Sequence, residues 1–247
     1  MFRSHKSLHK DKNQVLDYWN KSANRMLKAG QFAHLKDQMI FDHTWITTVK
    51  AFIKEGNIRD FDHILDVGCG WGRVISGIKY FCPNTIITGI DANQVRLDVA
   101  SNTLDQLELK NDVTLQLGDA DRLDFPDNSF DIVTSARLLQ YVVNPINTIH
   151  EFCRVVKPGG HIVITVPNKF NPIRLLTYTR ILYSPLTVKS WFYKNNLLKV
   201  SCRTIGFIPN YKRLQWRSKW LAIETLQNVP VCNLLGGLVL CSGVKGL

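Results

Sequence analysis

Short apolar runs alternate with longer segments of helical periodicity through the middle of the chain. The runs suit buried strands, and the segments between them carry apolar residues every three to four positions, as amphipathic helices do. The expected strands lie at residues 64–66, 85–90, 113–117, 130–133 and 161–166, and the expected helices between them at residues 72–80, 93–109 and 145–156. Such alternation predicts an α/β fold with a parallel sheet, right-handed crossovers and helices on both faces.

Two helical stretches precede the first strand, at residues 14–29 and 36–54. The second has its apolar side chains, among them Trp45, Val49 and Phe52, on one side. After the fifth strand the pattern is less regular, and we expect residues 206–247 to supply the two final strands. A helix near residues 218–227 would separate them, and residues 237–244 would form the closing strand.

A glycine-rich turn follows the first strand, where residues 64–73 read Ile-Leu-Asp-Val-Gly-Cys-Gly-Trp-Gly-Arg. Gly68, Gly70 and Gly72 stand at alternate positions after Asp66. Glycine is needed where a ligand lies against the backbone, because a Cβ atom would block the approach, and where φ is positive. The helix that begins near Gly72 would point its N-terminal amides at the same ligand. The turn therefore predicts a nucleotide-like ligand site.

The spacing of this turn separates two kinds of nucleotide site. The dinucleotide fingerprint requires a glycine at the position that Arg73 occupies, which weakens an NAD interpretation. The spacing Asp-x-Gly-x-Gly-x-Gly instead resembles the first motif of the class I S-adenosylmethionine-dependent methyltransferases. The cofactor that this resemblance implies is S-adenosyl-L-methionine, with S-adenosyl-L-homocysteine as product.

Later parts of the chain continue this resemblance in the same order. Asp91 ends the second strand, where an acid accepts hydrogen bonds from two ribose hydroxyls. In the family an acid after the third strand meets the adenine amino group, and the next amide meets the ring, which implies these roles for Asp119 and Ala120. Residues 125–133 resemble the family's loop and fourth strand, and residues 157–160 its turn before the fifth. The implied cofactor site comprises Asp66, Gly68, Gly70, Gly72, Asp91, Ala92, Asp119, Ala120 and Ser135.

The resemblance implies a doubly wound, mostly parallel seven-stranded sheet, a Rossmann-like methyltransferase fold whose last two strands form an antiparallel pair at one edge. We expect an N-terminal helical cover over residues 1–60, an S-adenosylmethionine-binding core over residues 61–168, and a basic, aromatic cap with the closing strands over residues 169–247. Family members use such N-terminal helices in the substrate wall, which makes Tyr18 and Trp19 candidates there. Simple packing of these helices on the domain explains both residues equally well.

Composition agrees with an enzyme built on one α/β domain with an appended part, since the chain has 247 residues, 45% of them hydrophobic. Residues 1–12 are polar and basic with no apolar segment after them, so we expect no signal peptide. Residues 231–244 form an apolar run too short to span a bilayer. The six cysteines have no Cys-x-x-Cys or metal-ligand spacing, which favours reduced thiols, no metal and a cytoplasmic location.

Charge is segregated in the last third of the chain. No acid occurs between Glu151 and Glu224, whereas residues 169–220 hold eleven lysines and arginines, equal to the net charge of +11, together with many aromatic residues. The segment leaves the fifth strand at the edge where ligands bind. It suits an anionic substrate such as a phosphate ester, an anionic membrane surface at the inner face of the membrane, or nucleic acid. Packing in a cap explains many of its aromatic residues as well, and Arg174 is a candidate for substrate binding.

Candidate substrate-facing residues follow the carboxyl ends of the fourth and fifth strands: Gln140, Tyr141 and Asn168. Many small-molecule methyltransferases have His where this chain has Tyr141. A phenol is a poor general base near neutral pH, so Gln140 and Tyr141 are catalytic candidates without an assigned base. Residues 134–137 lack the Asp/Asn-Pro-Pro-aromatic pattern of base-amino methylation, and no Pro-Cys context suits cytosine ring methylation.

The sequence thus favours methyl transfer to a small-molecule or lipid-linked acceptor by in-line displacement. Two alternatives stay open. One is an RNA methyltransferase that modifies groups other than base amino groups, and the other is a non-catalytic adaptor that uses its nucleotide pocket and cationic segment for binding.

Overall fold

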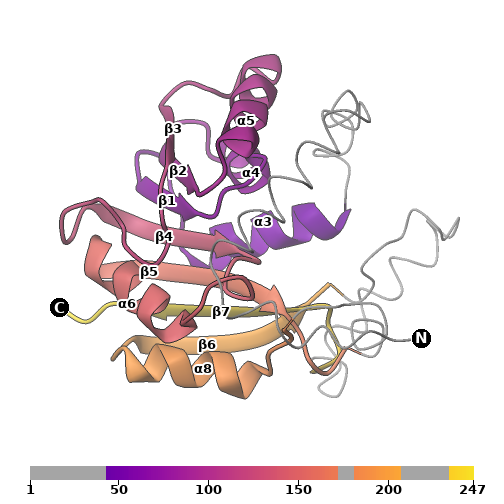
Figure 1. Ribbon diagram of the computed structural model, residues 1–247, viewed down its shortest axis with the longest axis vertical. Helices are drawn as coiled ribbons and strands as arrows, with labels where there is room; N and C mark the ends of the chain where they lie inside the picture. Colours follow the sequence, from indigo (N-terminus) through magenta and orange to yellow (C-terminus); the bar gives the residue numbers. More distant parts are fainter. Residues whose placement is uncertain (1–42, 172–180, 207–233) are drawn as a thin grey trace, which may run out of the picture.

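The computed structural model describes residues 43–171, 181–206 and 234–247. They form a seven-stranded sheet in the order β3-β2-β1-β4-β5-β7-β6 (Figure 1). The strands are β1 His63–Val67, β2 Ile86–Asp91, β3 Val113–Leu117, β4 Phe130–Ala136, β5 Val156–Pro167, β6 Leu198–Ile205 and β7 Leu238–Val244. β1 to β5 pair in parallel, and β7 is antiparallel to both β5 and β6. The expected doubly wound fold is confirmed.

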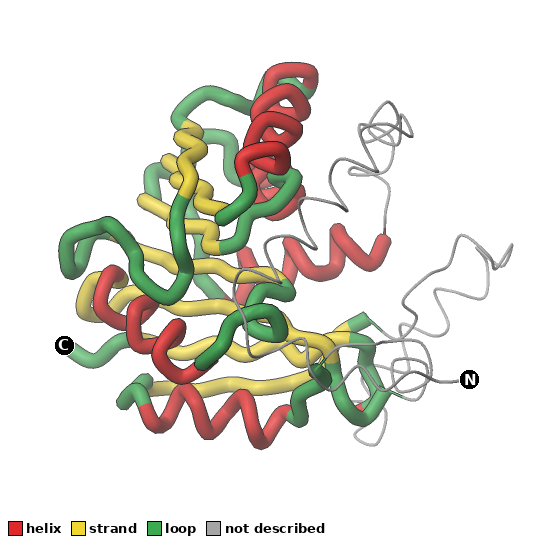
Figure 2. Tube along the Cα trace, viewed as in Figure 1, coloured by secondary structure: helices red, strands yellow, loops and turns green. Residues whose placement is uncertain are grey.

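Helices cover both faces of this sheet (Figure 2). The helices are α3 His43–Glu55, α4 Arg73–Phe81, α5 Gln94–Gln106, α6 Pro145–Val155 and α8 Pro185–Lys194. One buried cluster joins the sheet to α3, α4 and α5, and a second joins it to α6 and α8. Neighbouring strand residues such as Ile64 and Leu65 enter opposite clusters because side chains alternate along a strand.

Asparagine caps start two of the crossover helices. The side chain of Asn93 accepts from the Arg96 amide at the start of α5, and that of Asn144 accepts from the Ile146 and Asn147 amides at the start of α6. Such caps satisfy amides that have no partner inside the helix. They fix the points at which α5 and α6 leave the carboxyl edge of the sheet.

The position of the sixth strand corrects the sequence analysis. We expected both final strands within residues 206–247, and this was wrong for β6, which ends at Ile205. β6 is an edge strand on which Val200 and Cys202 pack against the core, while Lys199 and Ser201 are exposed. Its apolar pattern is therefore weak, and its cations belong to a strand rather than to a cap. The expected helix at 218–227 lies outside the described residues.

The fifth strand begins earlier than the sequence suggests. Residues 157–160, expected to be a turn, lie within β5, which starts at Val156. Gly159 has φ +77°, and the pairing register between β4 and β5 shifts between Phe130 and Ile132. The glycines thus form an irregularity inside the strand pair rather than a separate connection.

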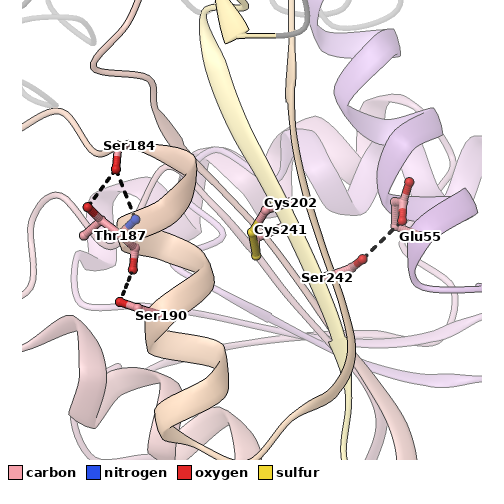
Figure 3. The surroundings of a disulfide bond; sticks show 7 residues. All are labelled: Glu55, Ser184, Thr187, Ser190, Cys202, Cys241 and Ser242. Atoms are coloured by element: carbon pink, nitrogen blue, oxygen red, sulfur yellow. Dashed lines mark hydrogen bonds between the residues drawn. A yellow bond between two sulfur atoms is a disulfide. The ribbon is translucent and has the colours of Figure 1, made fainter. Parts of the chain in front are cut away.

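A disulfide joins the two C-terminal strands, contrary to the expectation of reduced thiols throughout. Cys202 on β6 and Cys241 on β7 are paired across the antiparallel ladder (Figure 3). They are 39 residues apart in sequence, so no short motif signals the pair. On the other face of β7, Ser242 Oγ donates to Glu55 Oε2 at the end of α3, over 3.1 Å. Cys69, Cys82 and Cys153 are free thiols.

Within the described ranges, no helix is both long enough and apolar enough to cross a bilayer.

Candidate functional site

A cavity of about 260 Å³ opens at the carboxyl edge of the sheet, where the chain leaves β1, β2, β3 and β4. The wall is formed mainly by the turns that follow these four strands. It is lined by residues 67–71 with Arg73 and Val74, residues 90–93 with Arg96, residues 118–121, residues 136–143 except Leu139, and Trp45 on α3. In open α/β sheets ligands bind at this edge. The cavity is thus the candidate site, and its wall follows the strand order β3, β2, β1, β4.

Gly68 and Gly70 form the floor of the cavity at the end of β1. The amides of Gly68 and Cys69 both donate to the carbonyl oxygen of Ile90, over 2.8 and 2.9 Å, which holds the turn against β2. A Cβ atom on Gly68 would lie 2.9 Å from Leu138 Cδ1, whereas one on Gly70 would have no neighbour closer than 4.0 Å. Gly70 has φ +55° and faces open space. A ligand can therefore lie directly against its backbone.

Asp91 presents its carboxylate to the cavity from the end of β2. Its Oδ2 accepts from the Gly70 amide over 2.9 Å, and its Oδ1 accepts from the Asn93 amide over 3.0 Å. Burial raises the pKa of Asp91, while Arg96 and the backbone amides oppose that shift. These bonds join the turn after β1 to the turn after β2 and hold an acceptor group at the cavity wall.

Asp66 lies behind the glycine turn and does not line the cavity. Its Oδ1 accepts from Thr134 Oγ1 over 2.8 Å, and its buried Oδ2 has no partner within the described ranges. Burial is the main cause that raises the pKa of Asp66 to about 7; the charge of Asp91 adds to the rise, and the hydrogen bond from Thr134 opposes it. Asp66 therefore acts on the site through the β1–β4 pair rather than by facing the cavity.

The remaining residues of the expected cofactor site are divided between the wall and the scaffold. Ala92, Asp119 and Ala120 line the cavity. Gly72 does not line it; it starts α4 with φ +74°. Ser135 does not line it either, because its Oγ donates to the Val67 carbonyl oxygen over 2.9 Å, from β4 to β1.

The candidate acceptor-side residues also separate. Tyr141 and Gln140 line the cavity, but Gln140 is fully buried and its Nε2 donates to the Arg137 carbonyl oxygen. Asn168 is buried away from the cavity, where its Nδ2 donates to the carbonyl oxygens of Leu234 and Gly236, each over 2.7 Å. Asn168 therefore ties the end of β5 to the segment before β7. Tyr18, Trp19 and Arg174 lie outside the described residues.

Sequence reasoning missed two tryptophan–arginine stacks in the cavity wall. The Arg73 guanidinium lies 4.7 Å from the centre of the Trp45 ring, and the Trp45 Nε1 donates to the Arg73 carbonyl oxygen. The Arg96 guanidinium lies 5.0 Å from the centre of the Trp71 ring. Trp71 stands between two glycines of the motif, which was the available signal. Across the described ranges, no cluster of three His, Cys, Asp or Glu side chains suits a metal ion.

The fold and the site define a Rossmann-like protein with a nucleotide-type pocket at the carboxyl ends of β1, β2, β3 and β4. Residues 65–164 match the family described as "Methyltransferase domain". This part of the chain is thus similar to class I, S-adenosylmethionine-dependent methyltransferase domains.

Curated relatives include a demethylmenaquinone methyltransferase of Symbiobacterium thermophilum, 32% identical over 147 residues, which are 59% of this chain and 53% of that protein. A ubiquinone biosynthesis O-methyltransferase of Alkalilimnicola ehrlichii is 36% identical over 110 residues, which are 44% of this chain and 42% of that protein. The chain thus matches about half the length of these relatives. Among solved structures, the Haemonchus contortus phosphoethanolamine N-methyltransferase 2 shares the fold, with a TM-score of 0.69 at 18% identity over 96% of this chain and 60% of that one.

Proposed function

We propose that this protein transfers a methyl group from S-adenosyl-L-methionine to a small-molecule or lipid-linked acceptor and releases S-adenosyl-L-homocysteine. The observation that carries the proposal is the Asp91 carboxylate held at the cavity wall beside the bare backbone of Gly70. An acid at the end of the second strand next to a glycine turn suits a ribose with two free hydroxyls.

The order of groups along the wall supports one orientation of the donor. Asp119 and Ala120 follow β3 and suit the adenine, and Asp91 follows β2 and suits the ribose. The glycine turn follows β1 and suits the methionine part, with the first amides of α4 nearby. The sulfonium methyl would then face the residues after β4, where Arg137 and Tyr141 line the cavity.

The chemistry asks mainly for alignment in such a site. A sulfonium methyl is already electrophilic, so in-line displacement needs the acceptor atom held about 3 Å away with its orbital aligned. The acceptor atom forms a bond to the methyl carbon while the sulfur takes the electron pair of the breaking bond, and any proton leaves the acceptor. Tyr141 and Gln140 remain the candidates beside this reaction, and the tie from Gln140 to Arg137 favours a positioning role for Gln140.

An anionic group on the acceptor is favoured by Arg137. This residue is exposed, lines the cavity directly after β4 and has φ +56°. Its amide donates to the Thr165 carbonyl oxygen over 2.8 Å, and its carbonyl accepts from buried Gln140. The backbone is thus held on both sides while the cationic side chain stands at the acceptor end. Quinone methyltransferases among the relatives and a phosphoethanolamine methyltransferase among the similar folds support small acceptors.

Isothermal calorimetry with S-adenosylhomocysteine tests the donor site. We expect binding by the protein and a loss of about 100-fold in Asp91→Ala, since two hydrogen bonds to a charged acceptor are removed. Circular dichroism would check that the variant is folded. Absence of any binding by the unaltered protein would contradict the proposal.

Methyl transfer is then tested with labelled donor and separated extracts of lipids, RNA and small metabolites. We expect label in the lipid or small-metabolite fraction and a reduced yield in Arg137→Gln with unchanged donor affinity. A weaker donor affinity in Arg137→Gln would assign this cation to the donor carboxylate instead.

Label in RNA would favour the second candidate, RNA methylation, which the acid-free cationic segment between Glu151 and Glu224 supports. Donor binding without label in any fraction would favour the adaptor. The same segment supports peripheral contact with an anionic membrane surface.

A further inference from the structure

Arg96 lies against two parts of the donor site at once. In the first turn of α5, the Arg96 amide donates to Asn93 Oδ1 over 3.1 Å, and the Arg96 side chain lies beside the end of β2. There Arg96 Nη1 lies 3.8 Å from Asp91 Oδ2, and the guanidinium stacks on the Trp71 ring at 5.0 Å from its centre. The Arg96 and Asp91 side chains are only 12% and 9% exposed. One cation therefore bridges the turn after β1 and the acid at the end of β2.

The buried surroundings of Asp91 make the charge of Arg96 important for keeping the Asp91 carboxyl ionised. Burial raises the pKa of the Asp91 carboxyl, and Arg96 is the strongest of the groups that lower it. Within the part of the chain that the structure describes, Asp66 on β1 and the buried thiol of Cys69 also interact in this cluster, and burial raises the pKa of both. Among the charged side chains of the described residues that act on Asp91, Arg96 is thus the one that favours the carboxylate.

The distance of this ion pair leaves the carboxylate able to bind a ligand. At 3.8 Å the guanidinium attracts the charge without donating a short hydrogen bond. Asp91 Oδ2 accepts from the Gly70 amide and Oδ1 from the Asn93 amide, and the Ala92 amide is a third backbone donor to the carboxylate, whose two oxygens together can accept about four hydrogen bonds. The stack on Trp71 holds the guanidinium in this place. The acceptor capacity that remains lies at the cavity wall and suits a ribose hydroxyl.

We propose that Arg96 is a positioning residue for the donor, which holds the Asp91 carboxylate charged and oriented for the ribose hydroxyls while Trp71 holds Arg96 in place. This inference rests on the proposed donor site and extends it. Arg96 acts through Asp91 and need not touch the ribose.

A double-mutant cycle with a pH readout tests this role. S-adenosylhomocysteine affinity would be measured by calorimetry at pH 6 and pH 8 for the unaltered protein, Arg96→Met, Asp91→Asn and the double variant. We expect the loss of S-adenosylhomocysteine affinity that Arg96→Met causes to be about tenfold larger at pH 6 than at pH 8. Without the charge of Arg96, the Asp91 carboxylate takes up a proton more readily. In the Asp91→Asn background the same substitution should add no pH dependence, since an amide does not titrate there.

The effect of Arg96→Met is compared within each background, with and without the Asp91 carboxylate. This is necessary because Asp91→Asn also removes a charge that raises the pKa of Asp66. Arg96→Lys keeps the charge and should keep the pH profile of the unaltered protein, whereas Arg96→Gln should behave as Arg96→Met and provides a second neutral variant. Arg73→Met is the matched control, because Arg73 also lines the cavity and stacks on a tryptophan, Trp45 of α3. This substitution should not change the pH profile of S-adenosylhomocysteine affinity.

The outcomes separate the two proposals. Equal pH profiles for Arg96→Met, Arg96→Gln and the unaltered protein would overturn the role of Arg96, and so would an equal pH effect of Arg96→Met with and without Asp91. Failure of the unaltered protein to bind S-adenosylhomocysteine at either pH would instead overturn the proposed function.

Discussion

Gly70 combines positive φ with an empty position above its backbone, and the two properties can be tested apart. In Gly70→Ala the new Cβ atom would enter the cavity at φ +55°. We expect a loss of about 1–2 kcal/mol in the free energy of unfolding, from the left-handed backbone, and a large loss of S-adenosylhomocysteine binding. Urea unfolding and calorimetry measure the two effects.

Gly159→Ala is the matched control for this prediction. Gly159 has φ +77° and lies in β5, away from the cavity, with no neighbour closer than 3.9 Å to an added Cβ atom. The stability loss should be similar and the ligand affinity unchanged. Equal binding losses in the two variants would show that backbone strain, rather than ligand contact, explains the requirement at Gly70.

Asp66 is predicted to make stability fall as pH rises. Its pKa is raised from 3.8 to about 7 in the folded state, so between these values the folded protein holds a proton that the unfolded chain has lost. The free energy of unfolding therefore falls across this window by an amount on the order of a few kcal/mol, and it levels off above pH 7. Urea unfolding at pH 5 and pH 8 measures it.

Asp66→Asn isolates this contribution, because the amide cannot ionise and can still accept from Thr134. Relative to the unaltered protein, the variant should gain stability between pH 5 and pH 8. A constant difference in the free energy of unfolding between the two proteins across this range would show that Asp66 does not titrate between pH 5 and pH 8.

At the scale of single elements, the disulfide between β6 and β7 closes a loop with a sequence separation of 39 residues. Its removal in Cys202→Ala/Cys241→Ala should lower the free energy of unfolding by about 2–4 kcal/mol. Donor binding should change little, since β6 and β7 contribute no residue to the described cavity wall. Chemical unfolding with and without reductant, and calorimetry, measure the two quantities.

Cys153→Ala provides the comparison, since Cys153 is a partly buried free thiol beside the same core. The stability change that this substitution causes should be the same with and without reductant, whereas that of the disulfide variant should vanish under reducing conditions. Equal stability of the unaltered protein under oxidising and reducing conditions would contradict a stabilising role for the disulfide.

The sequence predicted the elements whose pattern is strong. β1, β2 and β4 are largely buried parallel strands with apolar runs, β3 is a partly exposed edge strand in which apolar and polar residues alternate, and the glycine turn has a fixed spacing, so all were found along with Asp91 at the cavity. β6 was misplaced because an edge strand with Lys199 and Arg203 lacks an apolar run. The tie from Gln140 to Arg137 and the burial of Asn168 depend on contacts that no local pattern encodes.

At the scale of the whole molecule, the acid-free segment after Glu151 is expected to act in capture of the acceptor rather than in donor binding. Replacement of Arg174, Arg180, Lys189 and Lys194 by Gln should leave the S-adenosylhomocysteine affinity unchanged and weaken binding to an anionic acceptor or vesicle. Lys189 and Lys194 lie on α8, which packs on β6 and β7 and contributes nothing to the described cavity wall.

Calorimetry and co-sedimentation with vesicles containing anionic lipid, at low and at raised salt, measure both effects. The matched control protein loses the same charge at exposed cations outside this segment and outside the cavity wall, by replacement of Lys50, Lys54, Arg59 and Lys110 with Gln. It should retain vesicle binding. Equal losses in both proteins would assign the effect to net charge.

The described cavity wall comes entirely from residues 45–143, before the last three strands of the sheet begin. The stretch after residue 168 is therefore a natural unit for exchange. Chimaeras that keep the first part of this chain and take the remainder from a relative with a known acceptor should retain donor affinity while changing what is methylated, which offers a route to engineering selectivity by grafting.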